Sequence, residues 1–271
     1  MRPSSREPQR ITSLSNDRIK AIRALEMRKE RRETGLFVAE GASILVTARD
    51  AGFLPVSLVL LADSAETGVH RGLLAWASKS GAEVLEVSEA VLGKLAAKDN
   101  PQTMLAVFRQ RFLPLADPTA IAADAAWVVL EEIRDPGNLG TILRTADAVG
   151  ASGVLLVGNC CDPYSRECVR ATMGSVFTVP VARATHDEFE AWRRGWRGDV
   201  VGTHLDATED FRSARYCGPT MLVMGSEGPG LSERMAAQCS RLVKIPMAGS
   251  LDSLTRAVAT ALTPDQIRPP H

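Results

Sequence analysis

Two polar residues in the second half of the chain have types and a spacing suited to chemistry. Asn138 carries an amide and Arg144 a guanidinium, so together they can hydrogen-bond and hold a ligand. A short loop, Asp135, Pro136 and Gly137, precedes them. In the alternative interpretation Asn138 is the N-cap of a helix and Arg144 is a solvated helix residue.

A glycine-rich stretch at residues 222–232, LVMGSEGPGLS, surrounds Glu227 with Gly225, Gly228 and Gly230. Glycines permit positive φ angles and a close approach of the backbone to a ligand. The spacing is neither a dinucleotide fingerprint nor a phosphate loop, because GxGxxG is missing and no Lys precedes Ser or Thr after the glycines. A plain tight turn is the alternative interpretation.

A third stretch at residues 244–259, KIPMAGSLDSLTRAVA, predicts a strand that stops at a proline, a loop, and a helix from Ser253. Backbone groups of Ile245 and Met247, beside a helix N-terminus, could recognise a purine edge without side chains. A strand-to-helix connection without a ligand is the alternative.

The elements that must position Asn138 and Arg144 lie in residues 127–157. The apolar run 128–130 predicts a buried parallel strand, apolar residues at helical spacing predict a helix over 139–149, and 153–157 predicts a second strand. Ligands of open α/β sheets bind at the carboxyl ends of the strands, so this βαβ unit favours a site that includes both residues.

Strand and helix alternate on both sides of this unit. Before it, the pattern predicts strands at 37–40, 56–61, 82–87 and 103–108, with helices at 42–51, 71–79 and 89–97. After it, the pattern predicts strands at 176–181, 200–205, 220–224 and 242–246, with helices at 186–196, 232–239 and 253–262. The prolines and small residues of 110–125 predict a linker. We expect two α/β domains, the second with a mostly parallel sheet covered by helices on both faces.

Charge and cysteine content narrow the class of protein. The net charge is zero, yet residues 1–32 hold ten Lys and Arg against four acids, a surplus of six. This basic arm either contacts nucleic-acid phosphates or is a solvated terminus.

The five cysteines form no CxxC pair, so neither a zinc site nor a disulfide framework is indicated. No uncharged apolar run could span a bilayer and MRPSSREPQR lacks a signal-peptide core, so we expect a cytoplasmic protein.

Taken together, the three stretches resemble the three motifs of the SpoU (TrmH-type) RNA 2'-O-ribose methyltransferases, in the SPOUT superfamily. The matching residues are Asn138, Gly140, Arg144, Thr145 and Ala146; then Gly225, Glu227, Gly228 and Gly230; then Ile245, Pro246, Met247, Gly249, Ser253 and Leu254. The segment CDPYSRECVRATMGSVFTVPV, at residues 161–181, also resembles the family. FVAEGASIL and NPQTMLAVF, at residues 37–45 and 100–108, resemble a substrate-binding domain similar to ribosomal protein L30e.

The resemblance implies an L30e-like RNA-binding domain (33–109) and a methyltransferase domain (126–271). Together with the basic arm (1–32) and the linker (110–125) that the composition indicates, the chain has four parts. It also implies a deep trefoil knot, S-adenosylmethionine as cofactor and a homodimer through the second domain. Methyl transfer from a sulfonium is a displacement that needs no metal, so we expect none. The expected activity is methyl transfer to a ribose 2'-hydroxyl of RNA, with ribosomal RNA first and transfer RNA second.

The family's motifs imply roles for particular residues. Asn138, Arg144 and Glu227 correspond to catalytic positions, with Arg144 gripping phosphate and stabilising the oxyanion. Gly225, Ile245 and Leu254 correspond to the family's cofactor-contacting positions, and we expect Thr203, after the preceding strand, to close the same cofactor pocket. The family usually has Asn where this chain has Thr255, which leaves open a catalytically impaired RNA-binding or ribosome-assembly protein. An ordinary nucleotide-binding enzyme is disfavoured by the missing phosphate loops.

Overall fold

The chain divides into two compact units. The computed structural model describes residues 9–62, 64, 68–96, 103–213, 216, 218–226 and 230–244 of the 271 residues. The first unit comprises Met1–Gln110 with Tyr164–Thr178, and the second comprises Arg111–Pro163 with Val179–His271. The segment Tyr164–Thr178 therefore packs with the first unit, although the sequence placed it in the methyltransferase domain.

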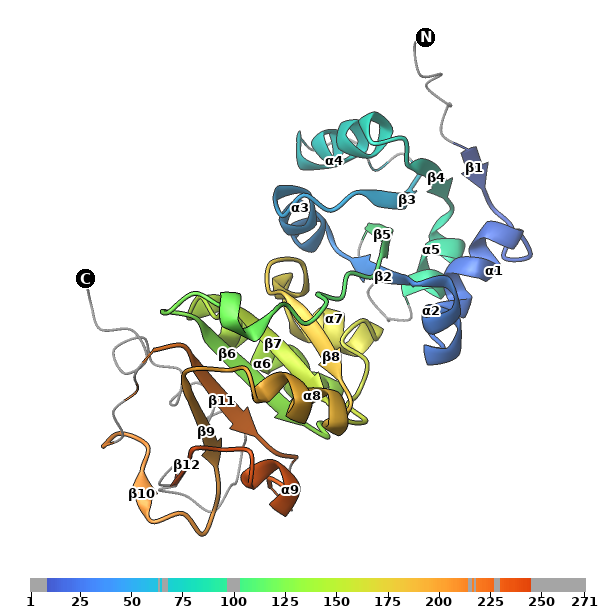
Figure 1. Ribbon diagram of the computed structural model, residues 1–271. Coiled ribbons are helices and arrows are strands. Elements are labelled where there is room, and N and C mark those ends of the chain that lie inside the picture. Colours follow the sequence, from blue (N-terminus) through green and yellow to red (C-terminus); the bar gives the residue numbers. More distant parts are fainter. Residues whose placement is uncertain are drawn as a thin grey trace. The chain divides into compact units, whose positions relative to one another are not determined.

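The first unit is built on a mixed five-stranded sheet in the order β1-β4-β3-β5-β2 (Figure 1). Its strands are β1 (Gln9–Ile11), β2 (Leu36–Glu40), β3 (Pro55–Leu61), β4 (Glu83–Val87) and β5 (Met104–Arg109). Strand β5 runs antiparallel to β2 and β3, whereas β4 is parallel to β1 and β3. Its helices are α1 (Asp17–Ala24), α2 (Arg28–Thr34), α3 (Ala42–Asp50), α4 (Gly68–Lys79), α5 (Glu89–Ala96) and α7 (Arg166–Ala171), with a 3-10 turn η2 (Ser175–Phe177).

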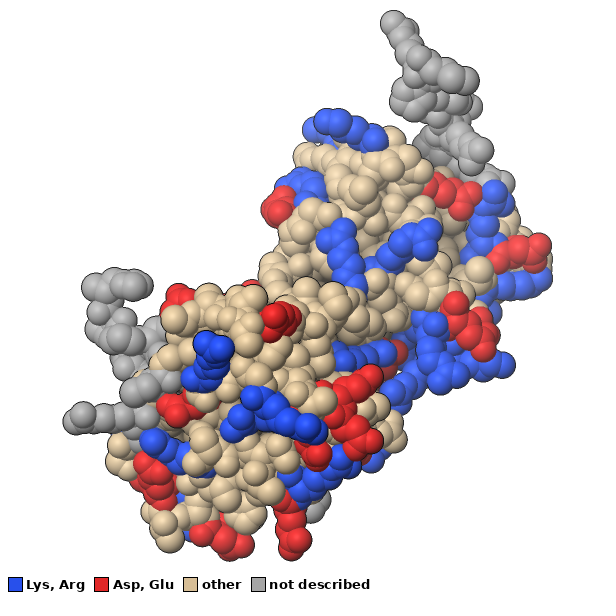
Figure 2. Space-filling view, viewed as in Figure 1, with Lys and Arg blue, Asp and Glu red and all other residues tan. Residues whose placement is uncertain are grey.

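Part of the predicted basic arm is folded. Residues from Gln9 onward form β1, α1 and α2, and Ile19 and Ile22 of α1 are buried in a cluster with residues of α5. Figure 2 shows the basic side chains over α1 and α2 interspersed with acidic ones, and Lys20 pairs with Asp17 at 3.1 Å. The buried isoleucines of α1 therefore make this segment part of the core of the first unit.

The second unit contains a seven-stranded sheet in the order β10-β12-β9-β11-β6-β7-β8, in which every recorded strand pair is parallel. Its strands are β6 (Ala126–Glu131), β7 (Gly153–Val157), β8 (Val181–Ala184), β9 (Asp199–Thr203), β10 (Glu209–Asp210), β11 (Thr220–Met224) and β12 (Arg241–Lys244). Its helices are α6 (Pro136–Ala148), α8 (His186–Arg193) and α9 (Glu233–Ala236), with a 3-10 turn η1 (Pro118–Ala120).

The central strands of this sheet are buried on both faces. Every residue of β6, β7 and β11 is buried. One core cluster joins Trp127 and Val129 of β6 to Phe189 and Trp192 of α8, and α6 contacts β7 outside this cluster. The predicted α/β class, with a mostly parallel sheet after a smaller α/β unit, is confirmed. The knot stays a prediction, because residues 245–271 lie outside the described part of the chain.

One predicted strand is wrong. Residues 176–181 do not form a strand: the 3-10 turn η2 covers Ser175–Phe177, and β8 begins only at Val181. Val176 and Phe177 are buried because they pack within the first unit, where the Phe177 ring lies 4.9 Å from that of Phe53. Two predicted helices are shorter than expected, since α8 ends at Arg193 and α9 covers only Glu233–Ala236. The predicted helix 253–262 lies outside the described residues.

Candidate active site at the strand ends of the second unit

The carboxyl ends of four adjacent strands meet at one edge of the second sheet. Strand β9 ends at Thr203, which pairs with Val243 of β12, and β11 ends at Met224, which pairs with Leu130 of β6. The predicted cofactor residues Thr203 and Gly225 therefore leave neighbouring strands on the same edge, as ligand sites in parallel sheets require. Thr203 is half-buried and Gly225 is buried.

Helix α6 carries Asn138 and Arg144 away from the end of β6. It begins at Pro136, and Asp135 is its N-cap, because the Asp135 carboxylate accepts a hydrogen bond from the Asn138 amide N–H at 2.6 Å. The interpretation of Asn138 as the N-cap is thus wrong, and Asn138 is a half-buried residue of the first helical turn. Leu139, Ile142, Leu143 and Ala146 are buried and fix the helix on the sheet.

Arg144 lies on the exposed face of α6. Its guanidinium forms no hydrogen bond or ion pair with the residues that the structure describes. The neighbouring threonine hydroxyls donate to carbonyl groups within the helix: Thr141 Oγ1 to Gly137 O at 2.9 Å and Thr145 Oγ1 to Thr141 O at 3.0 Å. Arg144 is therefore a charged donor on a well-anchored helix, available to a ligand.

The two described ends of the glycine-rich segment after β11, residues 225–226 and 230, lie close together. A Cβ added at Gly225 would lie 1.9 Å from the carbonyl oxygen of Gly230, which only glycine can avoid. The Gly230 N–H donates to Ser226 O at 3.1 Å, and Gly230 has a φ of 72°. At least two of the glycines thus build a compact turn at the strand end. Glu227 lies outside the described residues, as do Ile245, Leu254 and Thr255.

Glu131, the last residue of β6, is a buried carboxylate that the sequence analysis did not select. Only 3% of it is exposed, and its carboxylate accepts hydrogen bonds from the Ser232 N–H at 2.8 Å and the Ser232 hydroxyl at 2.5 Å. The ring nitrogen Nε2 of His186 lies 3.0 Å from the same carboxylate. Glu131 therefore ties the segment that follows the glycine loop to the end of β6 and to the start of α8. The acidic pair Glu131–Glu132 after an apolar strand was the available signal.

Glu132, the next residue, shapes the β6–α6 loop. Its φ is 54°, an uncommon backbone conformation for a residue other than glycine. The Glu132 carboxylate accepts from the Asn159 N–H at 2.8 Å and pairs with the Arg134 guanidinium. A Cβ at Gly158 would lie 2.3 Å from this carboxylate, so the small residue admits the Glu132 side chain. The loop that leads to Asn138 is consequently fixed by a hydrogen bond from the segment that follows β7.

The cysteines near this edge are poor nucleophiles. Burial, followed by the neighbouring Cys160 and Asp135, raises the pKa of Cys161 to about 12. Burial also raises the pKa of Cys160, and it raises that of Cys239 to about 12. A thiol must ionise to attack or to bind a metal, so these thiols favour neither role at neutral pH. In the described residues, no three His, Cys, Asp or Glu side chains cluster as a metal site would require.

No helix within the described ranges has both the length and the apolar character of a bilayer span.

Comparison with known proteins matches the two parts of the chain to two different families. Residues 125–263 match the family described as SpoU rRNA Methylase, and residues 16–106 match the MRM3-like substrate binding domain. The chain is 32% identical to the 23S rRNA (uridine(2479)-2'-O)-methyltransferase of Streptomyces viridochromogenes, covering 96% of this chain and 92% of that relative. It is 27% identical to the 23S rRNA (guanosine(2553)-2'-O)-methyltransferase of Bacillus subtilis, covering 93% and 96%. Among solved structures, the AdoMet-bound rRNA methyltransferase from Sinorhizobium meliloti has a TM-score of 0.86 and 41% identity, covering 96% and 97%.

Proposed function

The chain belongs to the SpoU rRNA methylase family, and we propose that it transfers a methyl group from S-adenosylmethionine to a ribose 2'-hydroxyl of ribosomal RNA. The observation that carries this proposal is the shared sheet edge at which Thr203, Gly225 and the β6–α6 segment with Asn138 and Arg144 leave adjacent parallel strands. The named relatives act on ribosomal RNA, which favours this substrate over transfer RNA.

The residues at the strand ends fit a cofactor held mainly by the backbone. The turn that starts at Gly225 follows β11, which pairs with the strand that ends at Thr203, and Ile245 follows the last residue of β12. We assign cofactor contacts to Thr203, Gly225, Ile245 and Leu254, and to Glu227 a role in holding the glycine loop. S-adenosylmethionine supplies the methyl group when bound.

Arg144 and Asn138 would act on the RNA. Methyl transfer to a hydroxyl demands alignment of the nucleophile and stabilisation of the developing alkoxide. Arg144 meets the second demand, because a guanidinium stays charged and grips phosphate and oxyanion through a planar fork of donors. Asn138, six residues before Arg144 on the same helix, would orient the ribose or Arg144 by hydrogen bonds. Neither task needs a metal ion, so we propose a metal-free reaction.

The remaining parts of the proposal concern assembly and place. We propose that the protein is a homodimer through the second unit and that it works in the cytoplasm, where its ribosomal RNA substrate would be found. The competing proposal is a catalytically impaired RNA-binding protein, for which Thr255 is the motivation. Both proposals predict RNA binding, but only the first predicts turnover.

The decisive experiment incubates the full chain with methyl-tritiated cofactor and total RNA, then separates the RNA by size and digests it with alkali. Label in ribosomal RNA that survives as alkali-resistant dinucleotides supports 2'-O-methylation. Label confined to transfer RNA would correct the substrate, and no label above background would leave the impaired RNA-binding protein.

Arg144 variants test the site in the same assay. Arg144→Ala removes an exposed helical side chain, so stability and cofactor affinity should change by about 0.5 kcal/mol or less. Activity should fall on the order of 100-fold or more, since a charged stabiliser of the oxyanion is lost. Arg144→Lys should rescue little, because an ammonium lacks the planar fork. Near wild-type methylation by both variants would show that Arg144 is only a surface residue.

A further inference from the structure

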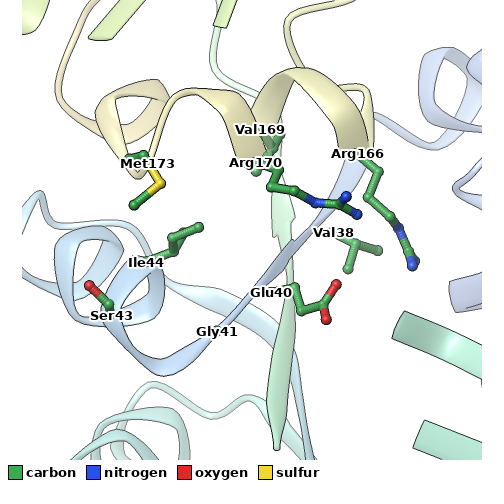
Figure 3. Close-up of a pocket in the computed structure, with 9 residues that line it drawn as sticks. All are labelled: Val38, Glu40, Gly41, Ser43, Ile44, Arg166, Val169, Arg170 and Met173. Carbon is green, nitrogen blue, oxygen red and sulfur yellow. The ribbon is translucent and has the colours of Figure 1, made fainter. Parts of the chain in front are cut away.

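The first unit contains a cleft between the β2–α3 turn and α7, outside the candidate active site. Its volume is about 230 Å³, and Val38, Glu40, Ile44, Arg166, Arg170 and Met173 are among the residues that line it. Pockets for drug-sized ligands span roughly 300–1,000 Å³, so this cleft suits a smaller group such as a single nucleobase. Figure 3 shows the charged side chains at one end and Met173 with Ile44 at the other.

The charged end presents the guanidiniums of Arg166 and Arg170 from α7 and the Glu40 carboxylate from the opposite wall. Arg170 reaches in from α7 and Glu40 from β2, toward the same part of the cleft (Figure 3). Arg170 is exposed and forms no hydrogen bond or ion pair with the residues the structure describes. Glu40 lies close enough to Arg166 for its charge to act on that guanidinium. A carboxylate has about four acceptor positions, so such an interaction leaves acceptor capacity for a ligand.

Arg166 anchors the wall that carries Arg170. Its guanidinium donates to the Leu95 carbonyl and lies 3.5 Å from the Glu26 carboxylate. Its side chain is 15% exposed. These contacts fix α7 on the first unit. The remaining Arg166 nitrogen, Nη2, is buried and has no hydrogen-bond partner in the described part of the chain, so Arg170 is the exposed cation at this end of the cleft and Arg166 a second, mostly buried one.

The apolar end is formed by Met173 and Ile44, and Met173 has an uncommon backbone conformation. Met173 is 62% exposed and has a φ of 54°, and it is followed by Gly174 with a φ of 111°. A Cβ at Gly174 would lie 3.1 Å from the Thr47 hydroxyl, so glycine allows this left-handed turn to approach α3 closely. The turn projects the Met173 thioether beside Ile44, and a flexible thioether packs well on an aromatic face. Uncommon backbone conformations concentrate at functional sites.

We infer that this cleft binds an unpaired guanine of the RNA substrate, with Arg170 at its N7 and O6 acceptors and Glu40 at its N1 and N2 donors. Guanine is the RNA base that carries an acceptor pair on one edge and a donor pair on the next, which matches a guanidinium and a carboxylate on facing walls. Proteins that read RNA sequence take splayed-out bases in this way and stack them on side chains. This inference rests on the proposed RNA substrate and adds a base specificity to the first unit.

The test measures binding of fluorescein-labelled RNA nonamers to the full chain by anisotropy. Each nonamer carries one guanosine, inosine, 7-deazaguanosine or adenosine among uridines; inosine lacks the N2 donor and 7-deazaguanosine lacks the N7 acceptor. Wild type should bind the guanosine nonamer on the order of 10-fold more tightly than each of the other three.

Two variants and one control assign the preference to the cleft. Glu40→Gln should bind the guanosine and inosine nonamers equally, and Arg170→Ala should bind the guanosine and 7-deazaguanosine nonamers equally. Arg71→Ala, which removes an exposed arginine of α4 in the same unit, should keep the full preference. Circular dichroism of each variant checks that the fold is retained, and Arg170→Lys provides a second variant that keeps the charge but loses the two-point contact.

Equal binding of the guanosine and adenosine nonamers by wild type, or no binding at millimolar protein, would overturn the inference. So would a guanosine preference that survives in both Glu40→Gln and Arg170→Ala. Methyl transfer to total RNA by the same wild-type sample separates the two proposals: transfer without guanosine preference rejects the cleft alone, whereas absence of transfer rejects the proposed function.

Discussion

Replacing Ser232 by alanine should lower the free energy of unfolding of the second unit by more than the loss of an ordinary helix cap does. The Ser232 hydroxyl donates to the buried Glu131 carboxylate at 2.5 Å and accepts from the Met235 N–H at 3.1 Å as the N-cap of α9. A hydrogen bond to a charged group contributes about 1.5–3 kcal/mol, and a lost serine cap costs about 1 kcal/mol. Glu131 keeps its bond from the Ser232 N–H, so we expect a total loss of about 2–3 kcal/mol.

Urea unfolding followed by tryptophan fluorescence measures this loss in the right unit. Three of the four tryptophans, Trp127, Trp192 and Trp196, lie in the core cluster of the second unit. The matched control is Thr185→Ala, which removes the N-cap of α8 but touches no buried carboxylate, and it should cost about 1 kcal/mol. A chain of two units can unfold in two steps, so the fluorescence transition is compared only among these variants.

A double-mutant cycle isolates the contact itself. Glu131→Gln, Ser232→Ala and the double variant should give a coupling energy above about 1 kcal/mol, since neighbours in one hydrogen-bond network couple by roughly 0.5–3 kcal/mol. The reasoning is refuted if Ser232→Ala costs no more than Thr185→Ala and the coupling is close to zero. In that case the short distance to Glu131 has no energetic weight.

Gly225→Ala places a methyl group 1.9 Å from the Gly230 carbonyl oxygen, so calorimetry should show loss of cofactor binding. In the control Gly93→Ala the added methyl group meets open space, so the free energy of unfolding should stay the same or rise by up to about 1 kcal/mol. Burial raises the pKa values of Cys161 and Cys239 to about 12, so both thiols stay protonated at neutral pH. At about pH 8, mass spectrometry should show that the two thiols of the folded protein are alkylated on the order of 100-fold more slowly than those of the protein unfolded in urea. Equal alkylation rates in the folded and unfolded protein would contradict the burial of these thiols. Sedimentation of the full chain should give twice the chain mass of 29.1 kDa, and a monomer at micromolar concentration would reject the proposed dimer.

The parallel sheet of the second unit could be predicted because its strands are short, apolar and separated by helical periods. The predicted strand at residues 220–224 coincides with β11 (Thr220–Met224), and the predicted βαβ unit corresponds to β6, α6 and β7. The strand predicted at 176–181 failed because periodicity reports burial and not the partner that buries a residue. Val176 and Phe177 are buried by the first unit, and no local signal distinguishes this from burial in a sheet.

The candidate site was accessible to sequence reasoning only in part. Arg144 could be placed on a helix after a strand, because the apolar spacing from residue 139 onward fixes its position, whereas Asn138 was expected in the preceding loop and lies in the first turn of α6. For Glu131 the only local signal was the acidic pair with Glu132 after an apolar strand, because its role depends on Ser232 and His186, which are distant in sequence and meet it only in the fold. The cap at Asp135 was missed although the order Asp135, Pro136 is a common helix start, with proline in the first turn.

The segment Tyr164–Thr178 makes the two units inseparable by a single cut. The chain crosses the boundary between the units three times, after residues 110, 163 and 178. The Tyr164 ring, 1% exposed, lies 4.5 Å from the ring of Phe37, so it is part of the first unit's core. A shortened chain that begins in the linker would carry this segment without the strand that buries it, and its apolar side chains would promote aggregation. Exchange of the first unit between relatives should therefore transfer Tyr164–Thr178 together with Met1–Gln110.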